Sequence, residues 1–256
     1  MNYVIIPARL ESTRFPRKPL QQVDILGDGT IFKPLILLTW AACNQKPLTE
    51  IAKVVIATDS REIYDVCRAE GAEVILTGNA KNGTMRCAEA ARYLIEPELI
   101  VNVQCEYPGI NATSIYKRLL ELENADDDDK TLISTFYYPL ENKNPSKNLV
   151  KLILDSANYV QYFSRENIPH KADLYNIHIG IYIYRYELLQ TLFYECGDPK
   201  ADIYTFGQEN LEQLDWLFCC HEFKAYLHDE ITGIDSPEQL KTFEKKLKNL
   251  IESLNL

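Results

Sequence analysis

The chain has 256 residues, 46% of them hydrophobic and 25% charged, a composition that is ordinary for a folded protein and excludes the fibrous and disordered classes. Its 27 cationic and 37 acidic side chains give a net charge of −10, which argues against general nucleic-acid binding. No apolar run is long enough to cross a bilayer, and we expect no signal peptide, because no basic segment precedes the first apolar stretch. We therefore expect a cytoplasmic protein without a membrane partner, whose seven scattered cysteines stay reduced.

The first element is an apolar run at residues 3–6, rich in β-branched side chains, which predicts a buried strand that Pro7 ends. Three prolines stiffen the loop after this strand. The same loop carries four cations: Arg9, Arg14, Arg17 and Lys18. A solvated basic turn is the plainer interpretation. Clustered positive charge in an acidic chain nevertheless favours a polyphosphate site, because guanidinium and ammonium groups bind phosphate oxygens.

Strands and helices alternate through the rest of the first half. The apolar patterns predict strands at residues 53–57, 73–77 and 99–103, and helices at residues 31–43, 61–70, 87–94 and 113–122. Asp59 or Ser60 is the expected N-cap of the helix at 61–70. Strand, helix and strand at this spacing form a βαβ unit, and hence a parallel sheet in an α/β fold. Ligands bind at the carboxyl ends of such strands, so the loops after Ile6, Ala57 and Val103 are expected to meet.

The segment at residues 82–86, Asn-Gly-Thr-Met-Arg, precedes the helix at 87–94. A Gly-Thr pair at a helix start presents backbone N–H groups to an anion. From these residues alone, however, an ordinary capped helix start is the favoured interpretation.

The second half is richer in strand patterns. Strands are predicted at residues 132–138, 149–154 and 159–164, which we expect to form an antiparallel extension, and also at 176–184 and 223–227. Helices are predicted at residues 203–218 and from Pro237, after the N-cap Ser236, to about residue 254. The four acids at 126–129 are typical of a solvated loop rather than of a metal site.

Residues 6–20 resemble the opening signature of the 3-deoxy-manno-octulosonate cytidylyltransferases, Ile-Pro-Ala-Arg-x-x-Ser-Thr-Arg-x-Pro-x-Lys-Pro-Leu. Later segments resemble the same family in the same order, and they cover nearly the whole chain. They are Ala-Thr-Asp at 57–59, the Gly-Thr-Met-Arg segment at 83–86, Asn-Val-Gln at 102–104, Tyr-Phe-Ser-Arg at 162–165 with Ile-Pro at 168–169, His-Ile-Gly-Ile-Tyr at 178–182, Leu-Glu-Gln-Leu at 211–214 and Gly-Ile-Asp-Ser-Pro at 233–237.

The resemblance implies a fold, a reaction and an assembly. The fold is a Rossmann-like nucleotidyltransferase domain over residues 1–256, with a mostly parallel central sheet, helices on both faces, and an antiparallel extension at about 130–185 for dimerisation and sugar binding. The reaction transfers CMP from CTP to the anomeric hydroxyl of an acidic 2-keto sugar and releases pyrophosphate, with Mg²⁺ required. The implied assembly is a homodimer.

The resemblance also implies roles for individual residues. Arg9, Arg14 and Lys18 would hold the triphosphate and stabilise the leaving pyrophosphate, a task for which their charges suit them. The other implied nucleotide contacts are Pro7, Ala8, Ser12, Gly83, Thr84, Arg86 and Gln104. The implied contacts to the sugar acid are Arg165, His178, Gly180, Tyr182, Glu212 and Gln213. For His178 without its motif, a core histidine is the plainer interpretation.

The chain departs from the family most clearly at Cys105-Glu106-Tyr107, where the family has Gly-Asp-Glu. The family's aspartate there is a magnesium ligand, so Glu106 and Asp235 are the implied metal ligands, with Glu106 one methylene longer. Arg17 similarly replaces a common glycine. These departures leave three functions open: CMP transfer to 3-deoxy-manno-octulosonate or a close relative, transfer to another acceptor such as a nonulosonate, an amino analogue or a phosphonate, and nucleotide binding by a catalytically weakened homologue.

Overall fold

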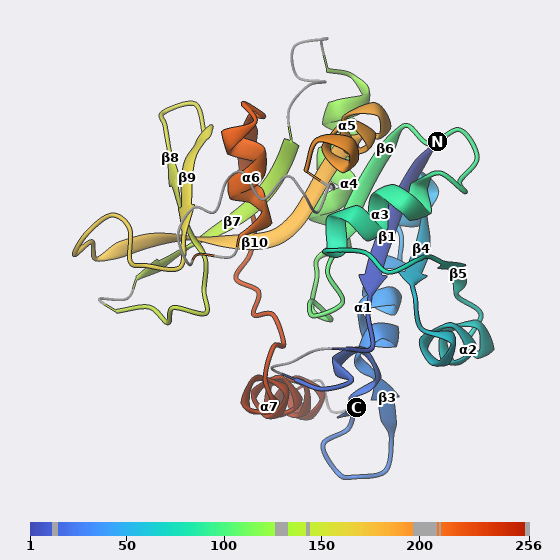
Figure 1. The fold of residues 1–256 in the computed structure, drawn as a ribbon. Helices are drawn as coiled ribbons and strands as arrows, with labels where there is room; N and C mark the ends of the chain where they lie inside the picture. The colour runs from blue at the N-terminus through green and yellow to red at the C-terminus, as the bar shows by residue number, and fades with distance from the viewer. Residues whose placement is uncertain (12–14, 126–132, 142–143, 197–208, 210, 254–256) are drawn as a thin grey trace.

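The computed structural model describes residues 1–11, 15–125, 133–141, 144–196, 209 and 211–253. These residues form a nine-stranded sheet in which the strands run β11-β7-β10-β6-β1-β4-β5, with β8 and β9 attached beside β10 (Figure 1). The parallel part consists of β1 (Asn2–Ala8), β4 (Ala52–Thr58), β5 (Glu73–Leu76) and β6 (Leu99–Val103). The predicted βαβ unit and parallel sheet are confirmed.

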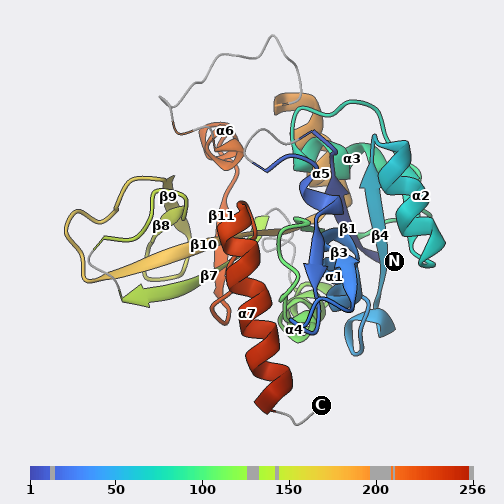
Figure 2. The ribbon, with the colours of Figure 1, turned by 90° about the horizontal axis from the view of Figure 1, so that it is seen from below.

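Helices cover both faces of this sheet, and the side chains of β1 are therefore buried on both sides. Val4 and Ile6 pack in one core cluster with α1 (Leu35–Cys43), α2 (Arg61–Ala69) and α4 (Ala112–Glu123). Tyr3 and Ile5 face the opposite cluster, with α3 (Gly83–Ala91), α5 (Tyr186–Cys196) and α6 (Glu212–Phe218). Figure 2 shows β1 between α1 and α3. Alternate side chains of one strand thus anchor two helical layers.

Three local predictions are wrong. Pro7 lies inside β1, paired with Ala57, instead of ending the strand. It is tolerated because β6 pairs with β1 only as far as Ile5, so beyond that point only one side of β1 has a strand partner. The predicted helix at 31–43 begins only at Leu35, because Phe32–Pro34 forms β3, which pairs with β2 (Gln22–Asp24). Helix α3 begins at Gly83 rather than at residue 87, with Asn82 as its N-cap.

The antiparallel part is built around one long strand, β10 (Leu174–Arg185). It pairs with β7 (Ile133–Glu141), β8 (Lys151–Leu154) and β6. Strand β9 (Val160–Ser164) pairs with β8, and β11 (Phe223–Leu227) pairs with β7. In the described residues β7, the first predicted strand of the extension, therefore pairs with β10 and β11 and not with β8 or β9. The expected three-stranded unit is wrong in this respect.

The final helix α7 (Pro237–Ser253) begins where predicted and packs its Leu240 against Phe15 and Val23 of the N-terminal loop and β2. Ser60 is confirmed as the N-cap of α2, accepting a hydrogen bond from the Ile63 N–H. Helix α5 is not among the predicted elements. Of the predicted helix at 203–218, the structure describes only the C-terminal part, which is α6. The acidic run at 126–129 lies outside the described residues. No helix in the described ranges is long and apolar enough to cross a membrane.

Candidate active site

A cleft of about 440 Å³ opens where β1 and β6 end. Its lining comes from the two strand ends, the short 3₁₀-helix η1 (Lys18–Leu20), the start of α3, the middle of β10, the start of α6, and residues 231–239. The loops after β1 and β6 therefore meet, as expected from a parallel sheet, whereas the loop after β4, which was expected to join them, contributes no residue to the lining.

The structure brings most of the residues singled out from the sequence into this cleft. Fifteen of them line it: Pro7, Ala8, Arg9, Lys18, Gly83, Arg86, Gln104, Glu106, Arg165, His178, Gly180, Tyr182, Glu212, Gln213 and Asp235. Thr84 is fully buried and lies behind the lining. Ser12 and Arg14 lie outside the described residues.

Lys18 is held between the two carboxylates that the resemblance names as metal ligands. Its Nζ donates to Glu106 Oε2 at 2.8 Å and to Asp235 Oδ1 at 2.9 Å, and its side chain is 14% exposed. Burial alone would lower the pKa of Lys18, but the charges of Glu106 and Asp235 outweigh it and raise that pKa above its ordinary value. The ammonium is therefore a fixed cation at neutral pH.

Local backbone geometry places these three groups. Arg17 precedes η1 with φ +56°, a conformation that favours glycine, which accounts for the common glycine that Arg17 replaces. The Ile234 N–H donates to the Glu106 carbonyl at 2.9 Å and joins the two carboxylate loops. At the start of α7, Gln239 Oε1 accepts from the Asp235 N–H at 2.8 Å. Gln239 is not among the predicted site residues, although Ser236-x-x-Gln239 is a capping-box pattern that could have identified it.

Cys105, the first of the departures, is a core residue. Its side chain is 4% exposed and packs in the cluster that contains α1 and α4. Its carbonyl accepts a hydrogen bond from Thr39 Oγ1 of α1 at 2.7 Å. Burial raises the pKa of the Cys105 thiol to about 12, so the thiol stays protonated at neutral pH.

Gln104 is fixed by a buried polar network below the cleft. Its Nε2 donates to Asn102 Oδ1 at 2.9 Å, and Asn102 Nδ2 donates to Thr84 Oγ1 at 3.2 Å and Tyr184 Oη at 3.1 Å. A Cβ at Gly83 would lie 2.8 Å from Gln104 Nε2, so any side chain there would displace this amide. The network fixes a planar donor–acceptor group at the edge of the cleft.

Arg86 is committed to a structural contact. It is 3% exposed, and its Nη2 forms an ion pair with Asp59. Its Nη1 donates to Thr77 Oγ1 at 2.6 Å and to the Gly78 carbonyl at 3.3 Å. Arg86 therefore ties the start of α3 to the ends of β4 and β5, and its charge is compensated before any nucleotide binds.

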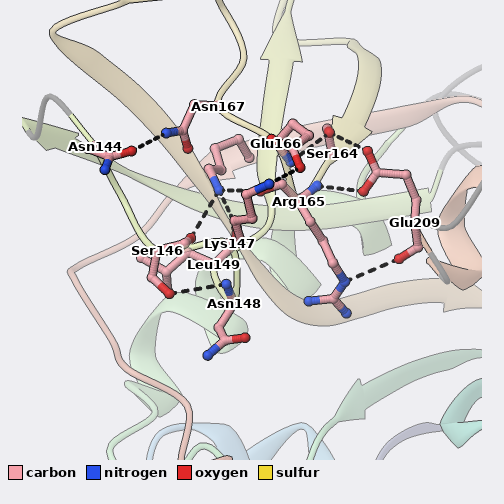
Figure 3. Close-up of polar contacts among 11 residues, drawn as sticks. Asn144, Ser146, Lys147, Asn148, Leu149, Ser164, Arg165, Glu166, Asn167 and Glu209 are labelled. Carbon is pink, nitrogen blue, oxygen red and sulfur yellow. Dashed lines mark hydrogen bonds and ion pairs between the residues drawn. The ribbon is translucent and has the colours of Figure 1, made fainter.

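Arg165 is anchored at three points at the other end of the cleft (Figure 3). Glu209 accepts from the Arg165 backbone N–H through Oε2 at 2.8 Å and from Nε through its carbonyl at 3.1 Å. The Arg165 carbonyl accepts from Nζ of Lys151 at 2.6 Å. Lys151 is fully buried and also donates to the Ser146 and Leu149 carbonyls, so the segment before β8 and the end of β9 form one unit.

Burial disfavours the charged form of both His178 and Glu212. Burial lowers the pKa of His178 to about 3, and Thr135 Oγ1 lies 3.0 Å from its Nε2. Burial also raises the pKa of Glu212 to about 7, against a smaller opposing effect of the hydrogen bond that Thr84 Oγ1 donates to Oε1 at 3.1 Å. His178 thus offers a hydrogen bond rather than a charge, while Glu212 titrates near neutrality.

Comparisons with known proteins cover almost the whole chain. Residues 3–249 match the family model described as cytidylyltransferase. The 3-deoxy-manno-octulosonate cytidylyltransferase of Chlorobium limicola is 39% identical over 261 residues, with 97% of this chain and 98% of that protein covered. The enzyme of the same name from a Nitratiruptor species is 35% identical over 248 residues, with coverage of 93% and 96%. The structure of CMP:2-keto-3-deoxy-manno-octonic acid synthetase complexed with CTP matches with a TM-score of 0.80 at 24% identity over 97% of this chain and 99% of that one, which confirms the predicted fold.

Proposed function

Because the chain belongs to the 3-deoxy-manno-octulosonate cytidylyltransferases, we propose that it transfers CMP from CTP to the anomeric hydroxyl of 3-deoxy-manno-octulosonate or a closely related 2-keto sugar acid, with release of pyrophosphate. The observation that carries this proposal is Lys18, held by Glu106 and Asp235 in the cleft where β1 and β6 end. The oxygen of the anomeric hydroxyl would attack the α-phosphorus, and the bond from that phosphorus to the bridging oxygen of pyrophosphate would break.

The nucleotide is proposed to bind at the ends of β1 and β6. Gln104, with the backbone of Pro7 and Ala8, would read the cytosine edge, since the buried network fixes the orientation of its amide. Exposed Arg9 and partly buried Lys18 would bind the triphosphate. Ser12 and Arg14 lie outside the described residues; Ser12 is still proposed to contact the nucleotide and Arg14 to bind the triphosphate. Gly83 would close over the nucleotide, with Thr84 behind it. Arg86, which lines the same cleft, would contribute to the nucleotide site, and its ion pair with Asp59 fixes the start of α3.

The two carboxylates fit the magnesium ion that the family requires. Mg²⁺ prefers oxygen ligands and in nucleotide sites takes one or two protein carboxylates with phosphate oxygens. Among the described residues no cluster supplies three metal-ligating side chains, which agrees with a site completed by the substrate. Glu106 and Asp235 would hold the ion, which would neutralise charge on the phosphates. In its absence, the Lys18 ammonium compensates the same two carboxylates.

The acceptor acid is proposed to bind between Arg165 and α6. Arg165 would bind the sugar carboxylate through its guanidinium, whose position Glu209 and Lys151 fix. His178, neutral at physiological pH, and Gln213 would hydrogen-bond sugar hydroxyls. Gly180, Tyr182 and Glu212 complete this end of the cleft.

Pyrophosphate release from CTP and Mg²⁺, measured with a panel of acids, tests the proposal. We expect release with 3-deoxy-manno-octulosonate and little with a nonulosonate, an amino analogue or a phosphonate. Preference for one of those acids would change the assigned acceptor. No release with any acid, together with CTP binding, would replace the proposal by a catalytically weakened nucleotide-binding protein. The single domain over residues 1–256, the homodimer and the cytoplasmic location are further parts of this proposal.

A further inference from the structure

Strand β10 is irregular where it forms the floor of the cleft. Its pairing with β7 shifts between Ile179 and Tyr182, so Gly180 and Ile181 have no regular partners on that side. Two side chains from other elements satisfy this bulge. Tyr107 Oη accepts from the Gly180 N–H at 3.0 Å, and Thr135 Oγ1 donates to the Ile181 carbonyl at 2.9 Å. A tyrosine outside the strand therefore replaces a missing ladder contact.

The ring of Tyr107 fits between two glycines. A Cβ at Gly233 would lie 3.2 Å from Tyr107 Cε1, which is closer than ordinary carbon contacts, and a Cβ at Gly180 would lie 3.4 Å from Tyr107 Oη. Gly233 is two residues before Asp235, and Glu106 directly precedes Tyr107. The same ring therefore contacts the Asp235 loop and the strand that forms the acceptor end of the cleft.

The type of side chain at position 107 also sets the charge near the two carboxylates. A tyrosine adds no carboxylate at this position, whereas Glu106 and Asp235 each pair with the Lys18 ammonium. Glu106, Asp235 and Lys18 then carry one net negative charge. The glutamate that the family resemblance leads us to expect at position 107 would add another carboxylate beside them.

We infer that Tyr107 is a positioning residue that fixes the acceptor end of the cleft, at Gly180, relative to the Glu106–Asp235 pair, and thereby determines how the acceptor acid binds beside the nucleotide. This inference rests on the proposed function for the identity of the acceptor. It assigns Tyr107 no contact with a reacting atom.

The test compares Tyr107→Phe with Tyr3→Phe. Tyr3 of β1 is also buried and does not line the cleft. Its hydroxyl donates a hydrogen bond to the Ile95 carbonyl at 3.0 Å. Both variants lose one tyrosine hydrogen bond and should lose similar thermal stability. In calorimetric titrations, Tyr107→Phe should weaken binding of 3-deoxy-manno-octulosonate about five- to tenfold, the scale of one lost hydrogen bond, and change CTP affinity less than about twofold. Tyr3→Phe should change neither affinity.

A third variant, Tyr107→Glu, tests the charge. Its anionic side chain should weaken binding of the acceptor acid more than Tyr107→Phe does, because it repels the carboxylate of the ligand. Unchanged acceptor affinity in Tyr107→Phe, or equal losses for acceptor and CTP, would overturn the inference and leave Tyr107 a purely structural residue. Turnover of the unmodified protein is measured alongside. If turnover is absent but Tyr107→Phe still weakens acceptor binding selectively, the proposed function alone is refuted. If turnover is present but Tyr107→Phe shows no selective loss of acceptor affinity, the inference alone is refuted.

Discussion

Glu212 makes the folding stability of the protein depend on pH. Its carboxyl is buried beside Thr84 and Tyr184, and Oε2 has no hydrogen-bond partner among the described residues. Asp215 of the same helix and Glu106 are nearby acids that also disfavour a charge here. Burial raises the pKa from an ordinary value of 4.5 to about 7. The folded protein thus keeps a proton that the unfolded chain has already lost between these two pH values.

The sign and size of the effect follow directly. Because the folded state binds more protons in this interval, the free energy of unfolding falls as pH rises from 4.5 to about 7. One pKa unit is worth about 1.4 kcal/mol, so the full loss is about 3 kcal/mol. Glu212→Gln keeps an acceptor for the Thr84 hydroxyl and cannot ionise. We expect it to leave stability unchanged at pH 4 and to raise it by up to about 3 kcal/mol at pH 8.

Urea unfolding of both proteins at the two pH values measures this difference. Glu187→Gln, which removes an exposed carboxylate from α5, is the matched control and should show no such pH-dependent gain. If Glu212→Gln changes stability equally at pH 4 and pH 8, the carboxyl is not protonated in the folded state and the reasoning is refuted. Unchanged acceptor affinity between pH 6 and pH 8 would further show that the charge of Glu212 does not affect binding of the acceptor acid.

Three further predictions concern the other end of the cleft. Lys18→Ala should lower turnover by at least ~10²-fold, the scale of one preorganised donor. It should also destabilise the metal-free protein, with Mg²⁺ restoring the melting temperature; loss of stability without loss of turnover would exclude a role at the triphosphate. Arg86→Ala should cost about 1–3 kcal/mol of stability, because it removes the buried hydrogen bonds that tie α3 to Thr77 and Gly78, and a loss below about 0.5 kcal/mol in urea unfolding would contradict this. Glu106→Asp should lower turnover at saturating Mg²⁺, since the shorter carboxylate withdraws from Lys18; a faster variant would indicate a degenerate metal site.

Local patterns in the sequence predict much of this fold because its strands and caps are local. The strand at 99–103 and the N-cap Ser60 follow from short apolar runs and one hydroxyl. Pro7 was misjudged because its tolerance depends on where a neighbouring strand stops pairing. The pairing of β7 with β10 and β11 likewise depends on contacts distant in the chain, which periodicity does not encode.

In the candidate site, too, local patterns predict some features and contacts distant in the chain determine the others. The motifs identify residues that gather in one cleft, but the partners of these residues are long-range. Lys18 meets Glu106 across 88 positions and Asp235 across 217, so the sequence alone does not reveal that the cation sits between the carboxylates. Arg86 was interpreted as a nucleotide contact, and only the position of Asp59 after β4 shows that its charge is already compensated. The hydrogen bond from Gly180 to Tyr107 is equally non-local.

Strand β10 has a mechanical consequence for the cleft. It runs without interruption from the acceptor side, where it pairs with β7 and β8, to the parallel sheet, where it pairs with β6. The two walls are thus joined by a continuous hydrogen-bonded strand and not by a flexible linker. Any widening of the cleft must bend this strand, and the bulge at Gly180 and Ile181 is where the fewest ladder bonds resist bending. Closure around substrates is therefore expected to be a small flexing motion centred on Gly180, with no swinging of separate lobes.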